Sequence, residues 1–151
     1  MNYSFDYDNT LIKYAYLYDE EGNIIDAVYD KPHQENINLL RELSEDINNT
    51  IYIVTARVKG LTFEPCIDSS PKPEDLIRVL NLPVAEIVYT KNRCKLPVLV
   101  ENNISDHWDD CPEQCKRIND SGLLKAWEVK APPGINAFLK KKFIKLLKEQ
   151  V

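Results

Sequence analysis

Residues 3–11 read Tyr-Ser-Phe-Asp-Tyr-Asp-Asn-Thr-Leu, and this stretch decides the interpretation of the whole chain. Residues 3–5 form a short predicted strand, and two carboxylates, Asp6 and Asp8, follow it directly. One carboxylate can attack a phosphorus atom and form an aspartyl phosphate, while the other protonates the leaving oxygen and later deprotonates a water molecule. The alternative is a turn in which Asp and Asn side chains cap the local backbone.

Strand-like and helix-like segments alternate along the rest of the chain. Residues 12–18 and 24–29 are rich in β-formers and flank a turn, which predicts a β-hairpin. This alternation predicts an α/β fold with a parallel sheet, right-handed crossovers and three layers. Since ligands of such sheets bind at the carboxyl ends of the strands, function is expected there. The further predicted strands are 50–54, 86–89, 104–109 and 126–129, and the predicted helices are 32–47, 74–80, 95–103, 112–118 and 136–150.

A hydroxyl follows the apolar strand 50–54 directly. Thr55 can donate a hydrogen bond to a phosphate oxygen, and the backbone N–H of Ala56 can add a second. Thr55 can equally cap the segment that follows it. Arg57 is either a substrate contact or a surface residue, and we expect the surface.

Two lysines, Lys91 and Lys95, precede the next carboxylate-bearing strand. A fixed ammonium can neutralise a phosphoryl group, although most lysines are simply solvated. Lys95 opens the predicted helix 95–103 directly, so we favour it over Lys91.

Strand 104–109 ends in adjacent carboxylates, Asp109 and Asp110. Such a pair is costly to bury unless it is paired or binds a metal, and Mg²⁺ prefers oxygen ligands. Asp109 would be the direct ligand and Asp110 its support. The alternative, an N-cap role for Asp110 beside Pro112, can coexist with metal binding.

The order and spacing of these four features resemble the haloacid dehalogenase (HAD) superfamily of phosphohydrolases. The resemblance extends from Tyr3 to about Pro112 and implies a Rossmann-like, three-layer sheet and a Mg²⁺-dependent phosphatase. The matching positions are Asp6-Tyr7-Asp8-Asn9-Thr10, Thr55, Lys95 or Lys91, and Asp109-Asp110.

The resemblance also implies roles for these residues. Asp6 would be the nucleophile and Asp8 the general acid and base, with Thr55 and one of the two lysines holding the phosphoryl group. Mg²⁺ would bind Asp6, the backbone carbonyl of Asp8, and Asp109. The carboxylate at Asp8 favours a phosphatase or phosphotransferase over the dehalogenase branch.

A large substrate-selecting cap has no room in this chain, because only about 44 residues separate Thr10 from Thr55. We therefore expect residues 1–151 to form one HAD-like domain, in which the hairpin at about 12–30 is the only flap. Such an open site would admit a nucleotide, a nucleic-acid 3′ or 5′ phosphate end, or a phosphoprotein. Small capless relatives include the phosphatase parts of polynucleotide end-repair enzymes, to which the likeness is general.

The hairpin carries Tyr14, Tyr16 and Tyr18 on one face of a strand. They can stack on a base or pack on the core with their hydroxyls at its edge, and we favour packing. Of the two histidines, His33 is expected at the surface near a helix start. His107 is expected to be structural, with a supporting role beside the metal strand left open.

Composition excludes several classes of protein. Hydrophobic residues make up 44% and charged residues 28%, which is typical of a folded domain rather than a disordered chain. The net charge of −5 argues against a general nucleic-acid coat, yet it leaves room for a single nucleotide or one nucleic-acid end. The chain has no membrane-spanning run and no signal peptide, so we expect a cytoplasmic protein without a membrane partner.

The four cysteines are expected to be free thiols, at Cys66, Cys94, Cys111 and Cys115. A zinc site of Cys111, Cys115 and His107 is a minor alternative, because the usual paired knuckles are missing. The predicted last helix, 136–150, is amphipathic with a lysine-rich outer face. That face is expected to be solvated, with an anion-binding surface as the minor alternative.

Three rival functions remain. The chain could be an inactive family member that only binds, a phosphoacceptor receiver domain, or a mutase or transferase. A receiver would carry its acceptor Asp in mid-chain, whereas here Asp6 and Asp8 stand at the first strand.

Overall fold

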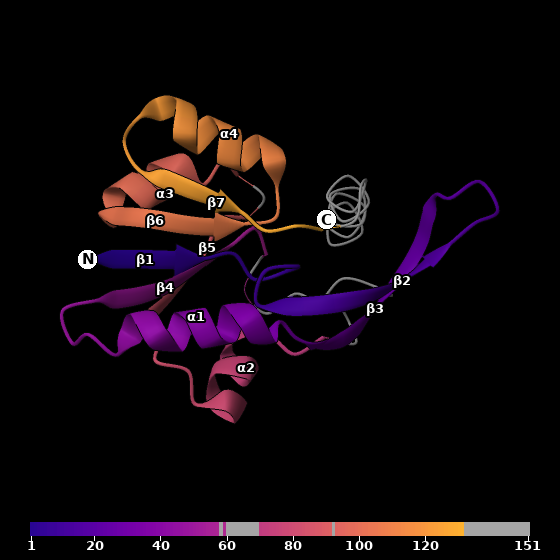
Figure 1. Ribbon diagram of the computed structural model, residues 1–151, viewed down its shortest axis with the longest axis horizontal. Coiled ribbons are helices and arrows are strands. Elements are labelled where there is room, and N and C mark those ends of the chain that lie inside the picture. The colour runs from indigo at the N-terminus through magenta and orange to yellow at the C-terminus, as the bar shows by residue number, and fades with distance from the viewer. Residues whose placement is uncertain (58, 60–69, 92, 132–151) are drawn as a thin grey trace.

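The computed structural model describes residues 1–57, 59, 70–91 and 93–131 (Figure 1). Its centre is a five-stranded sheet in the order β5-β4-β1-β6-β7, and every neighbouring pair in it is parallel. The predicted α/β class with a parallel sheet is confirmed. The strands are β1 (Asn2–Phe5), β4 (Thr50–Thr55), β5 (Glu86–Tyr89), β6 (Ile104–Asp109) and β7 (Lys125–Glu128).

Helices lie on both faces of this sheet, which gives the three expected layers (Figure 1). Neighbouring residues of β4 show how each strand serves both faces. Ile53 packs into the core that includes Leu40 of α1 and Leu76 of α2, and Val54 packs into the core that includes Leu99 of α3. The helices are α1 (Gln34–Ser44) and α2 (Pro73–Leu80) on one face, and α3 (Leu96–Glu101) and α4 (Pro112–Ser121) on the other. The arrangement is compatible with a Rossmann-like fold.

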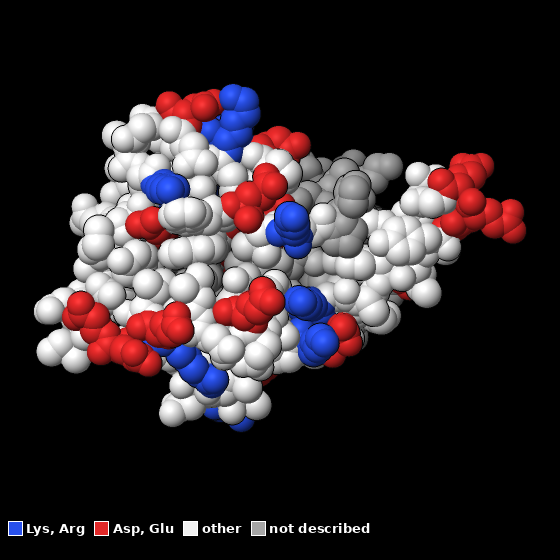
Figure 2. All heavy atoms as spheres, viewed as in Figure 1, with Lys and Arg blue, Asp and Glu red and all other residues white. Residues whose placement is uncertain are grey.

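The predicted hairpin forms a separate antiparallel ribbon of β2 (Ile12–Tyr18) and β3 (Ile24–Pro32), which projects from the carboxyl end of β1 (Figure 1). Asp19 closes its turn, because its carboxylate accepts hydrogen bonds from the backbone N–H groups of Glu21 and Asn23 at 2.9 and 2.8 Å. Figure 2 shows acidic side chains gathered at this tip, whereas both signs of charge are mixed over the rest of that face.

The start of α1 differs from the prediction. Pro32 is the last residue of β3 rather than the first of the helix, as a proline at a strand terminus allows. His33 is the N-cap, and its side chain accepts a hydrogen bond from the backbone N–H of Asn36 at 3.4 Å. The prediction that His33 lies at the surface was therefore wrong, since it is only 9% exposed.

The other helix ends follow ordinary capping. Helix α3 starts one residue after the predicted Lys95, with Pro97 in its first turn, and α4 starts at Pro112 as predicted and is closed by Gly122 at a φ of 69°. Among the described residues, no helix is long and apolar enough to cross a membrane. The predicted helix 136–150, its lysines and Cys66 lie outside the described residues.

Candidate functional site

Three strand ends bring the predicted site residues to one edge of the sheet. Asp6 follows β1, Thr55 ends β4 and Asp109 ends β6, and β1 lies between the other two strands. The backbone N–H of Asp6 donates to the carbonyl of Trp108 at 2.8 Å, which continues the β1–β6 ladder to the residue before Asp109. Because adjacent strands lie about 4.8 Å apart, side chains at these ends can share partners.

Lys95 is the shared partner of two of these carboxylates. Its Nζ donates to Oδ1 of Asp6 at 2.8 Å and to Oδ2 of Asp109 at 2.7 Å, and all three side chains are buried. Burial acts to lower the pKa of Lys95, but the two carboxylates hold it above its ordinary value. Lys91, the other predicted candidate, is exposed and has a left-handed φ of 56°, so the structure brings only Lys95 into the cluster.

Asp6, Asp109 and Asp110 form a compact acidic group, in which one carboxylate oxygen from each residue lies within 4.8 Å of the others. Burial and the neighbouring charge of Asp109 raise the pKa of Asp6, and burial with both neighbours raises the pKa of Asp110. Burial acts against Asp109 too, but Lys95 and His107 keep its pKa below the ordinary range. Ionisation of all three carboxyl groups would therefore place more negative charge here than Lys95 alone balances.

These residues suit a hard divalent cation, because Mg²⁺ prefers carboxylate oxygens as ligands. A bound cation would also lower the raised pKa values of Asp6 and Asp110 and favour their ionised forms. No other group of His, Cys, Asp or Glu side chains within the described ranges has metal-binding geometry. That finding includes the zinc alternative at Cys111, Cys115 and His107. The side chain of Asp8 does not belong to the acidic group.

His107 orients the carboxylate of Asp109. Its Nε2 lies 2.8 Å from Oδ2 of Asp109 and its Nδ1 lies 2.6 Å from the hydroxyl of Ser4. Since a carboxylate only accepts, a neutral His107 donates from Nε2 and accepts from Ser4 at Nδ1. The other oxygen of Asp109 accepts from the backbone N–H of Cys111 at 3.0 Å, so both oxygens are oriented.

Arg57 belongs to the site, although of the two alternatives that the sequence left open we had favoured the surface. It was expected at the surface, yet it is 2% exposed and forms a bidentate pair with Asp8, from Nε at 2.9 Å and from Nη2 at 2.7 Å. Nη2 also donates to Ser70 at 2.8 Å, and the Tyr7 ring lies 4.7 Å from the guanidinium carbon. Its position two residues after Thr55 places it near the sheet edge that carries Asp8, but this position alone does not show that its side chain is buried.

The ion pair with Arg57 favours the ionised form of Asp8. Burial acts to raise the pKa of Asp8, but the charge and hydrogen bonds of Arg57 hold it below its ordinary value. The Tyr14 hydroxyl donates to Oδ1 of the same carboxylate. Asp8 is therefore held as an ionised acceptor.

Thr55 is fully buried, and its hydroxyl accepts a hydrogen bond from the backbone N–H of Arg57 at 3.2 Å. This is the capping role that the sequence left open, and the half-buried Ala56 lies inside that turn. Nearer the nucleophile candidate, Thr10 donates from its hydroxyl to Oδ2 of Asp6 at 3.2 Å.

The hairpin tyrosines divide into two groups. Tyr14 and Tyr16 pack on the core and donate to Asp8 and Asn9, which confirms the expected packing with hydroxyls at its edge. Tyr18 is 52% exposed and does not follow that expectation. The hairpin thus contributes directly to the surroundings of Asp8.

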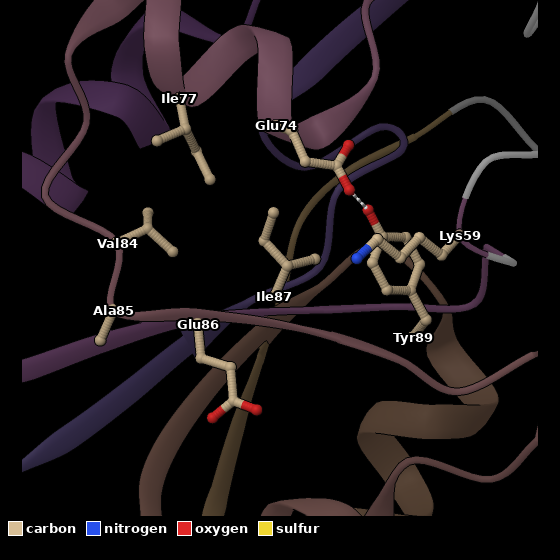
Figure 3. Close-up of a pocket in the computed structure, with 8 residues that line it drawn as sticks. All are labelled: Lys59, Glu74, Ile77, Val84, Ala85, Glu86, Ile87 and Tyr89. Carbon is tan, nitrogen blue, oxygen red and sulfur yellow. Dashed lines mark hydrogen bonds between the residues drawn. The ribbon is translucent and has the colours of Figure 1, made fainter.

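A separate cavity of about 270 Å³ lies between α2 and β5 (Figure 3). It has an apolar side that includes Ile77 and Ile87, and a polar end where Tyr89 donates to Glu74. Tyr89 pairs in register with Thr55, so this end lies near the same sheet edge. No predicted site residue lines the cavity.

Comparison with known proteins does not extend this picture, since no family model and no curated protein matches the chain.

Proposed function

We propose that the protein is a Mg²⁺-dependent phosphomonoesterase of the HAD-like type, in which Asp6 carries the phosphoryl group. One observation carries the proposal. A buried lysine bridges Asp6 and Asp109 at 2.8 and 2.7 Å, inside a group of three carboxylates at the carboxyl edge of a parallel sheet. Lys95 would balance charge on the nucleophile and the phosphoryl group, and the acidic group would hold a cation.

The reaction follows from the positions of two carboxylates. An oxygen of Asp6 would attack phosphorus, the bond from phosphorus to the leaving oxygen would break, and a protonated Asp8 would give its proton to that oxygen. Water would then attack the aspartyl phosphate and lose a proton to Asp8, which releases inorganic phosphate and restores Asp6. Thr10 orients Asp6 for this attack, since its hydroxyl already contacts Oδ2.

Mg²⁺ is part of the proposal because the site contains residues that could bind it. Asp6, Asp109 and Asp110 supply side-chain oxygens, and the backbone carbonyl of Asp8 is the further ligand expected from the resemblance. Bound Mg²⁺ would neutralise charge on the phosphate as it approaches these carboxylates. His107 would keep Asp109 oriented through its contact with Oδ2.

The direct test is release of inorganic phosphate from an aryl phosphate, a panel of nucleotides, and phosphorylated oligonucleotides. Each assay runs with Mg²⁺ and with chelator. We expect metal-dependent turnover that Asp6→Asn abolishes. Asp120→Asn is the matched control, because Asp120 is an exposed carboxylate whose partner Lys116 is also exposed. Absence of turnover on every substrate with folded wild-type protein would refute the phosphatase.

For the substrate we prefer a nucleotide or a nucleic-acid phosphate end, because the sequence predicts an open site with only the hairpin as a flap. The same assay ranks these against a phosphopeptide and small metabolite phosphates. Product analysis separates hydrolysis from transfer to another acceptor.

A second candidate, a slow phosphoacceptor or binding module, is favoured by one observation. Arg57 and Tyr14 hold Asp8 as an acceptor, and an aspartyl phosphate would persist if Asp8 stayed held. Intact-mass measurement after incubation with a small phosphodonor separates the two. A stable gain of one phosphoryl group supports the second candidate, whereas rapid return to the starting mass with phosphate release supports the phosphatase.

A further inference from the structure

The proposed reaction has to open the ion pair between Arg57 and Asp8. Three donors point at the Asp8 carboxylate, namely Nε and Nη2 of Arg57 and the hydroxyl of Tyr14. A carboxylate in this arrangement only accepts hydrogen bonds, so it has no proton for a leaving oxygen. Bidentate arginine–carboxylate pairs are among the stronger polar contacts in proteins, so another anion must take over the guanidinium before Asp8 is free.

Arg57 keeps one donor group unused. Its Nη1 is buried and has no hydrogen-bond acceptor among the described residues. The same is true of Nδ2 of Asn9, the residue that follows Asp8. Buried donors without acceptors cost free energy, so the unused Nη1 of the guanidinium that contacts Asp8 indicates a place for an entering oxyanion.

Two contacts of Arg57 hold its guanidinium at the site independently of Asp8. The Tyr7 ring lies 4.7 Å from the guanidinium carbon, and Ser70 accepts from Nη2 at 2.8 Å, so neither contact depends on the Asp8 carboxylate. A phosphate dianion carries more charge than a carboxylate and matches the planar fork of arginine equally well.

We propose that Arg57 exchanges its partner, so that the phosphate group of the substrate takes the hydrogen bonds of Arg57 and thereby frees Asp8. Release from Arg57 removes two of the three donors that occupy the Asp8 carboxylate, so this carboxylate becomes available to the leaving oxygen. Arg57 is then a phosphate-binding residue, and binding of the substrate phosphate releases the Asp8 carboxylate from its ion pair. The inference rests on the proposed function, but phosphate binding tests it without any turnover.

A double-mutant cycle of Asp8→Asn and Arg57→Gln, in the full chain with Mg²⁺, measures the exchange. The probe is inorganic phosphate, titrated by calorimetry. Asp8→Asn removes the competing charge, so we expect phosphate to bind about tenfold tighter than to wild type. In the Arg57→Gln background the gain should fall to about twofold, which is what removal of a nearby charge alone would give.

The matched control is Arg78→Gln, because Arg78 is an exposed arginine whose partner, Asp75, lies 3.3 Å away on the same helix. In that background Asp8→Asn should keep its full gain. An equal gain with and without Arg57, or no gain in either, would overturn the exchange.

A second measurement uses the wild-type chain and stays decisive even where Arg57→Gln does not fold. The Nε–H resonance of Arg57 reports its bond to Asp8, and Asp8→Asn gives the position of the released state. We expect inorganic phosphate to move the wild-type resonance toward that position. Phosphate that binds and leaves this resonance in place would refute the exchange.

The outcomes separate the two proposals. Arg57-dependent coupling without turnover would leave the exchange standing and remove the hydrolase. Turnover with no coupling would do the reverse, and absence of phosphate binding to wild type and to Asp8→Asn would overturn the exchange.

Discussion

A single residue, Lys95, supplies positive charge to the acidic group of Asp6, Asp109 and Asp110. Its ammonium group contacts both Asp6 and Asp109, and its side chain is only 3% exposed. Removing one partner from a buried ion pair costs about 3–5 kcal/mol, since the remaining charge loses its compensation.

We therefore expect Lys95→Gln to lower the free energy of unfolding by an amount of this order, measured by urea denaturation. Phosphate release should fall by about 10²–10³-fold, as for other groups that stabilise transition-state charge. Lys91→Gln is the control, because Lys91 is exposed, and it should change neither quantity. Equal effects of the two substitutions would contradict the role given to Lys95.

The residues of the site differ in how far the sequence could predict them. Asp6, Asp109 and Asp110 stand next to strand ends, and parallel pairing brings them together without further information. Arg57 could not be placed in the same way. Its burial depends on the carboxylate of Asp8 and the ring of Tyr7, and only packing decides whether an arginine finds such partners.

Elements were predicted best where their ends carry strong local signals. Strands β5 and β6 have the predicted bounds, and α4 begins at the predicted proline and is closed by Gly122. The start of α1 was wrong, since Pro32 suits both a helix start and the end of an edge strand. Which strands neighbour β1 is a tertiary property that local patterns do not contain.

The N-cap of α1 makes stability depend on pH. Burial, with the charge of Lys13 adding to it, lowers the pKa of His33 below its ordinary value. The unfolded chain therefore binds a proton more readily than the folded protein, so stability is complete above about pH 6.5 and is lost as the pH falls below it. We expect wild type to lose stability between pH 7 and pH 5, measured by urea unfolding.

His33→Asn isolates this effect, because asparagine can still accept the hydrogen bond from the backbone N–H of Asn36 and does not titrate. The variant should lose less stability over the same pH interval. Parallel curves for the two proteins would mean that His33 is not the group responsible.

The proposed metal binding would act on the whole molecule, because a ligand that binds only the folded state stabilises all of it. With Mg²⁺ at 100 times its dissociation constant the gain is about 2.7 kcal/mol. For a chain of this size that raises the thermal midpoint by about 5–10 °C. We expect this rise in wild type and in Asp120→Asn, and a much smaller one in Asp110→Asn. The same rise in all three, followed by scanning calorimetry, would show that the ion binds elsewhere.

The central place of β1 between β4 and β6 has a consequence for how the protein is made. Lys95 and Asp6 are 89 positions apart, and His107 reaches back 103 positions to Ser4. While a ribosome has not yet reached β6, the nascent chain can close its hairpin, but it has no partner for one whole side of β1. The acidic group therefore comes into existence late in synthesis, and a chain interrupted before β6 carries Asp6 and Asp8 without the machinery that would let them act.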